Sequence, residues 1–182
     1  MVSSKKFISE LFSLARYEVE NSIVYAIIDA GIYREFIDIL DIENPKHRIL
    51  FKDMFVREYE NVAPYLVKLS MDDPLTKQII DEGYTKPWLS FLVSNLDIDS
   101  LAEVLKAYIN PYSQVHKQEI IFRFYDPRNI ARFIKMLTEE EFQLFKSDIG
   151  GFLVCIDINE PTLIHIYNDK NPNMILLKEV AS

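Results

Sequence analysis

The chain has 182 residues, of which 49% are hydrophobic, and this length and composition favour one globular domain over a disordered segment. Its 28 acidic and 20 basic residues give a net charge of −8, which argues against a partner as negatively charged as nucleic acid. Only four glycines are present, too few and too scattered for a Gly-rich phosphate loop, and a single cysteine excludes an intrachain disulfide.

The first forty residues predict a helix, a strand and a second helix. Residues 4–19 carry apolar side chains at helical spacing, which places an N-terminal helix within residues 1–22. Ile23–Ile28 is an apolar run rich in β-branched residues, typical of a strand buried on both faces. Asp29-Ala-Gly31 predicts a turn, and residues 33–40 return to the helical period.

The middle of the chain continues this alternation. Tyr65–Leu69 and Trp88–Val93 predict strands, whereas residues 48–63 fit a short strand and a helix equally well. Pro74 suits the first helical position, and Gly83 suits the end of the helix that follows. Helix-start signals occur at Asp73, at Ser100 with Glu103, and at Thr138 with Glu141.

Ile120–Leu137 reads as a strand that runs directly into a helix. Residues 120–125 alternate with the period of two that a strand requires. Asp126 then fits the N-cap and Pro127 the first helical position. One apolar stripe of a helix follows, formed by Ile130, Phe133, Ile134 and Leu137.

The last part of the chain is rich in strand-like sequence. Two apolar runs, residues 152–158 and 162–167, flank Asn159-Glu-Pro161 and predict a β-hairpin. If those three residues form the loop, Cys155 lies directly opposite His165.

These elements together predict an α/β fold. We expect a mixed, largely parallel sheet flanked by helices, with a C-terminal β-hairpin. Residues 1–182 form a single domain in this interpretation, divided into an N-terminal helix (1–22), an α/β region (23–145) and a strand-rich tail (146–182). No apolar run reaches the roughly 18 residues of a membrane-spanning helix, and the N-terminus lacks a signal-peptide pattern, so we expect a cytoplasmic protein without membrane contact.

Two residue pairs are candidates for catalysis. Cys155 with His165 would form a nucleophile–base dyad, but no third group that orients the base is identifiable, and both residues also fit a strand face in the core. Asp29 and Asp126, each between a predicted strand and helix, could hold a metal or share a proton. Helix capping by Asp126 and turn formation at Asp29 explain both residues without such a role. We therefore expect no catalytic site, no cofactor and no metal.

Arg123, Arg128 and Arg132 cluster around the predicted strand–helix junction, together with Tyr125. Arginine and tyrosine are enriched in protein interfaces, so these four residues are candidates for binding a partner. The alternative is a set of intramolecular ion pairs with Asp126 or with the acidic residues 139–141.

The order of several segments resembles one protein family, the effector-chaperone (adaptor) domain of bacterial type VI secretion, often called Tap or TEC. The similarity extends over about residues 23–145, and its most specific piece is Phe122-Arg-Phe-Tyr-Asp-Pro-Arg128. Residues 111–119 lack the glycines common in the family, and the tail after Lys146 is shorter than in many relatives. The other matching segments are Tyr25–Gly31, Ala63–Leu69, Trp88–Ser94 and Leu101–Ile109.

The resemblance implies a non-enzymatic cytoplasmic protein of bacterial competition. Such a protein binds a secreted toxic effector and helps to load it onto the spike (valine-glycine repeat) protein of the secretion needle. Two alternatives stay open, an immunity-type protein that binds and neutralises a toxin, and an enzyme that uses Cys155 and His165.

Overall fold

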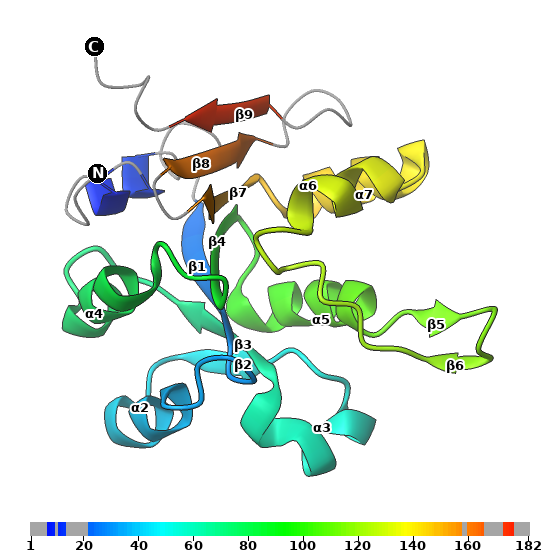
Figure 1. The fold of residues 1–182 in the computed structure, drawn as a ribbon, viewed down its shortest axis with the longest axis horizontal. Coiled ribbons are helices and arrows are strands. Elements are labelled where there is room, and N and C mark those ends of the chain that lie inside the picture. Colours follow the sequence, from blue (N-terminus) through cyan, green and yellow to red (C-terminus); the bar gives the residue numbers. More distant parts are fainter. Residues whose placement is uncertain (1–6, 10, 14–21, 158–159, 166–172, 177–182) are drawn as a thin grey trace.

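We analysed a computed structural model, which describes residues 7–9, 11–13, 22–157, 160–165 and 173–176 (Figure 1). Its centre is a seven-stranded sheet with the order β2-β3-β1-β4-β7-β8-β9. The strands are β1 (Ile23–Asp29), β2 (His47–Ile49), β3 (Pro64–Lys68), β4 (Leu89–Ser94), β7 (Gly151–Asp157), β8 (Glu160–His165) and β9 (Asn173–Leu176).

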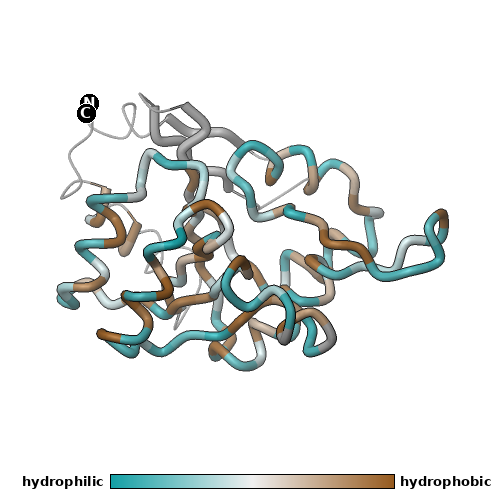
Figure 2. Tube along the Cα trace, turned by 60° about the horizontal axis from the view of Figure 1, so that its bottom comes forward, coloured by the Kyte–Doolittle hydropathy of each residue, from teal (hydrophilic) through white to brown (hydrophobic). Residues whose placement is uncertain are grey.

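Helices cover both faces of this sheet, with α2 and α4 on one side and α5, α6 and α7 on the other (Figure 1). A small hairpin of β5 (Tyr112–Ser113) and β6 (Gln118–Glu119) extends away from the body in both views (Figure 1 and Figure 2). The helices are α2 (Phe36–Glu43), α3 (Asp53–Tyr59), the 3-10 helix η1 (Glu60–Val62), α4 (Pro74–Gly83), α5 (Ile98–Ile109), α6 (Ile130–Met136) and α7 (Glu139–Asp148).

Every strand pair in the sheet is antiparallel, so the prediction of a largely parallel sheet is wrong. Strands do alternate with helices, but the connections through α2 and α4 each skip one strand. Helix α2 connects β1 to β2, which run in the same direction with β3 between them. Helix α4 connects β3 to β4 in the same way, with β1 between them. The strand inserted into each βαβ unit runs the opposite way and makes all neighbours antiparallel.

The strand β1 lies inside the sheet, paired with β3 on one side and β4 on the other. Six of its seven residues are buried, which confirms the prediction from the apolar run Ile23–Ile28. For the predicted N-terminal helix, residues 7–9 and 11–13 are helical and the remainder of 1–22 before Ser22 lies outside the described residues. No helix among the described residues has both the length and the apolar character needed to cross a bilayer.

The capping predictions have mixed outcomes. Asp73 caps α4 as expected, and Thr138 with Glu141 forms the predicted capping box at the start of α7. The box predicted at Ser100 is wrong, because α5 begins earlier and its N-cap is Asp97. The carboxylate of Asp97 accepts hydrogen bonds from the backbone N–H groups of Asp99 and Ser100 at 2.9 and 3.0 Å.

The predicted strand over residues 120–125 does not form. Its backbone bonds locally instead, with the N–H of Ile120 donating to Pro111 and the N–H of Phe122 donating to Ile109. The helix after it begins at Ile130, later than predicted, because Pro127, Arg128 and Asn129 form a turn first.

An aromatic cluster holds this irregular segment against the sheet. The ring of Phe124, which is fully buried, lies 4.6 Å from Phe133 of α6 and 6.4 Å from Phe152 of β7, measured between centroids. Phe145 of α7 stacks on Phe152 at 6.1 Å. The alternation of residues 120–125 therefore reflects packing into this cluster and not membership of the sheet.

Candidate functional site

The proposed Cys155–His165 pair is separated by the register of the hairpin. Strands β7 and β8 pair as predicted, but Cys155 lies opposite Pro161 and His165 lies opposite Gly151. A shift of four residues along an antiparallel pair corresponds to about 13 Å. The expected three-residue loop is wrong, because Glu160 and Pro161 already belong to β8. The register thus removes the geometric argument for a dyad.

Asp29 is the first polar group of interest at the sheet end. It ends β1, is only 3% exposed, and its carboxylate forms an ion pair with the guanidinium of Arg123. The hydroxyl of Tyr125 donates a second hydrogen bond to the same oxygen at 3.2 Å. The backbone N–H of Gly31 also donates to this carboxylate. Three donors from two distant parts of the chain therefore hold one buried charge.

The space around Gly31 is tight for a side chain. A Cβ atom at this position would lie 3.0 Å from Oδ1 of Asp29 and 3.2 Å from the carbonyl oxygen of Val62. The Asp-Ala-Gly sequence therefore encodes a close turn around the Asp29 carboxylate.

Burial raises the pKa of the Asp29 carboxyl, because a charge in a low-dielectric site loses its hydration. The positive charge of Arg123 and the hydrogen bonds from Tyr125 and Gly31 lower this pKa without cancelling the effect of burial. Burial and the neighbouring Asp29 likewise raise the pKa of the Tyr125 hydroxyl above its usual range.

Asp126 and Arg128 form a second, separate pair. Both carboxylate oxygens of Asp126 accept from the Arg128 guanidinium, at 2.9 and 2.5 Å, and one also accepts from the Arg128 backbone N–H at 3.0 Å. Burial by itself would raise the pKa of Asp126, but the hydrogen bonds from Arg128 outweigh it and lower that pKa. The positive charge of Arg123 adds to this lowering.

The four predicted partner-binding residues therefore occupy different environments. Tyr125 is 4% exposed and belongs to the interior, while the side chain of Arg123 is 42% exposed and bound to Asp29. The side chain of Arg128 is 63% exposed although it pairs with Asp126, and Arg132 is exposed on α6. The alternative of an ion pair with Asp126 thus describes Arg128, whereas Arg123 pairs with Asp29, an acceptor that the sequence analysis did not name.

A cavity of about 250 Å³ beside the edge strand β2 was not predicted. Asp41, Glu60 and His47 line it, together with Tyr65 of β3. A second cavity of about 340 Å³, lined by Phe51, lies on the other side of β2. Glu60 and Phe51 belong to the segment 48–63, whose ambiguous periodicity gave no sign of a site. Among the described residues, no group of three or more His, Cys, Asp or Glu side chains is placed to hold a metal ion.

Comparison with known proteins gives one match. No curated protein and no solved structure matches the chain significantly. A family model described as Domain of unknown function (DUF4123) matches residues 24–144, which is well over half of the chain. The match begins in β1 and ends in α7, so it includes both Asp29 and the 120–129 segment that binds it. The chain therefore belongs to the DUF4123 family.

Proposed function

We propose that this protein is a cytoplasmic, non-enzymatic adaptor of type VI secretion, which binds a toxic effector and assists its loading onto the spike protein. The observation that carries the proposal is the family match over residues 24–144 together with the Phe122–Arg128 motif inside it.

The geometry of the motif supports a binding role over a catalytic one. Its charged groups are already paired, Arg123 with Asp29 of β1 and Arg128 with Asp126. A general acid or base needs a group that can exchange a proton with a substrate, whereas these carboxylates are committed to structural hydrogen bonds.

Arg128 and Arg132 are the residues of this region that we assign to partner contact. Both side chains reach the surface beside α6, and Arg128 is held in a fixed orientation by Asp126. A pre-oriented guanidinium loses little conformational entropy on binding.

Co-purification tests the proposal directly. The protein carries an affinity tag and is expressed with each effector and spike protein of the same secretion gene cluster. We expect a stable complex with one effector, and deletion of the gene should abolish secretion of that effector while the needle still assembles. Normal secretion of every effector after deletion would refute the proposal.

Expression of the effector in a cell that has no secretion apparatus separates the adaptor from an immunity protein. Rescue of that cell by the present chain would assign it to toxin neutralisation. An adaptor is expected to bind the effector there without abolishing its toxicity.

A further inference from the structure

The edge strand β2 has an unpaired outer side. It pairs with β3 on its inner side, and no strand among the described residues pairs with its other side. The backbone N–H of Leu50 donates to the carbonyl of Pro64, and the backbone N–H of Lys68 donates to the carbonyl of Lys46. Because hydrogen-bonded positions alternate along an antiparallel strand, the backbone N–H and C=O of Arg48 face β3. The backbone N–H groups of His47 and Ile49 therefore point outward, and no described residue accepts from either.

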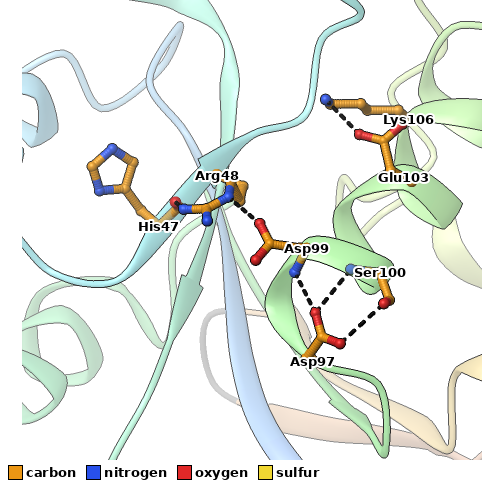
Figure 3. A network of polar contacts seen from close by, with 7 residues as sticks. All are labelled: His47, Arg48, Asp97, Asp99, Ser100, Glu103 and Lys106. Atoms are coloured by element: carbon orange, nitrogen blue, oxygen red, sulfur yellow. Dashed lines mark hydrogen bonds and ion pairs between the residues drawn. The ribbon is translucent and has the colours of Figure 1, made fainter.

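The two sides of β2 differ in shape and charge. In Figure 3 the ring of His47 lies on one side of the strand, and Asp99, which binds the guanidinium of Arg48, lies on the other. The same guanidinium donates to the backbone carbonyl of His47 at 2.7 Å. His47 points toward the α2 side, where its ring lies 5.9 Å from that of Tyr65. Arg48 points toward α5, where it binds Asp99 at 2.5 Å. A strand added beside β2 would place alternate side chains into these two environments.

The cavity on the α2 side is acidic. Asp41 and Glu60 are among the residues that line it, and neither forms an ion pair with a described residue. Burial raises the pKa of Tyr65 to about 12, and the charges of Glu60 and Asp41 add to this rise. Apolar side chains of Ile37 and Leu40 form part of its lining. Such a cavity suits a lysine or arginine, whose stem is apolar and whose end is positive.

The cavity on the α5 side is lined by Arg48, Asp53 and Lys106, and the two basic side chains are already paired. Arg48 binds Asp99, and Lys106 binds Glu103 at 2.8 Å (Figure 3). Phe51 and Val56 contribute apolar surface to it. This side therefore suits an apolar side chain.

We propose that β2 binds an extended segment of a partner protein by strand addition, with basic side chains in the Asp41–Glu60 cavity and apolar side chains in the Phe51–Val56 cavity. Main-chain hydrogen bonds donated by the outward N–H groups of His47 and Ile49 supply affinity, and the two cavities supply selectivity. The partner's positive charge complements the acidic cavity and the net charge of −8. This binding surface would serve the proposed adaptor function, and the inference rests on that function only for the identity of the partner.

The test uses the whole chain, labelled with ¹⁵N, and an eight-residue synthetic peptide of alternating lysine and valine. We expect amide shift changes concentrated at residues 46–50 and around the two cavities. A peptide of alternating glutamate and valine should bind at least about tenfold more weakly, since it reverses two or more charge contacts. Shift changes absent from β2, or equal affinity for both peptides, would overturn the proposal.

Three variants separate the contribution of the acidic cavity from that of the main-chain hydrogen bonds. Asp41→Lys with Glu60→Lys should weaken the lysine peptide about tenfold or more, whereas Asp81→Lys on the exposed face of α4 is the matched control and should not. Ile49→Pro removes an outward N–H without removing a donor from the β3 ladder, and it should abolish the shift changes. Because this proline variant can also lose stability, the charge variants decide the outcome if it does not fold.

Failure of this inference is distinguishable from failure of the adaptor function. An effector that co-purifies equally with the wild type and the Asp41→Lys, Glu60→Lys variant leaves the function intact and refutes the surface. A peptide that binds β2 in a protein that co-purifies with no effector supports the surface and refutes the function.

Discussion

Replacing Arg123 by methionine tests whether the ion pair with Asp29 fastens the 120–129 segment to the sheet. Methionine keeps an unbranched apolar stem and removes the charge and the donors. Breaking a fully buried pair costs about 3–5 kcal/mol, because the remaining charge has no partner. The side chain of Asp29 is 4% exposed but that of Arg123 is 42% exposed, so water screens part of the interaction. Tyr125 and Gly31 also continue to donate to Asp29, and we expect a loss of about 2 kcal/mol.

Urea unfolding at pH 7.5, followed by the fluorescence of the single tryptophan, measures this loss. A loss of about 2 kcal/mol corresponds to a fall in Tm of about 4–8 °C for a chain of this size. In a background of Asp29→Asn the same replacement should cost less, since no buried charge is left unpaired. A change below about 0.5 kcal/mol, or equal costs in both backgrounds, would show that the pair does not hold the segment.

The pH dependence gives an independent check of the same pair. Because the folded pKa of Asp29 lies above the ordinary value of 3.8, the native state retains this proton over a window in which the unfolded chain has lost it. The contribution of Asp29 to stability is therefore greatest below pH 3.8 and declines as pH rises through the raised folded pKa. Asp29→Asn should remove this decline, and Arg123→Met should extend it to higher pH. A decline that is unchanged in Asp29→Asn would assign it to another group.

Three further predictions concern separate parts of the fold. Asp126 has a lowered folded pKa, so its contribution is present above pH 3.8 and is lost as pH falls through the lowered value; Asp126→Asn should flatten this acid-side loss in urea titrations, and an unchanged loss would contradict the assignment. Thr138→Ala should cost about 1 kcal/mol by thermal unfolding because it removes the capping box of α7, whereas Thr138→Ser should retain the cap. Gly83→Ala should cost about 1–3 kcal/mol and shift tryptophan emission, because the new Cβ would lie 2.2 Å from Cη2 of Trp88; unchanged emission would mean that Trp88 does not pack on this glycine.

Local signals in the sequence predicted the helices and strands of this protein better than they predicted which strands lie side by side. The apolar run Ile23–Ile28 marks a strand buried on both faces, and the cap residues Asp73 and Thr138 mark helix starts. These signals act over a few residues and are independent of the rest of the fold. Residues 120–125 show the limit of such a signal, since burial in an aromatic cluster produced a strand-like period without a strand.

The sequence also could not show which carboxylate binds Arg123. The arginine was identified as a candidate site residue, but its partner Asp29 is 94 positions away and reaches it only when the sheet has formed. The Cys155–His165 prediction failed for a related reason, because one different loop length moves every pairing along the hairpin.

Neighbouring residues are enough to indicate a strand-and-helix domain with an arginine-rich junction, because side-chain period and capping act over a few positions. The antiparallel sheet, the binding of Arg123 to Asp29 and the outer N–H groups of β2, unpaired within the described residues and set between two cavities, follow only from the assembled fold. A strand's period shows which of its faces are buried and carries no information about the strand that lies beside it. Hydrogen bonding between distant segments determines which strands are neighbours. Both the Asp29–Arg123 pair and the position of β2 at the sheet edge depend on it.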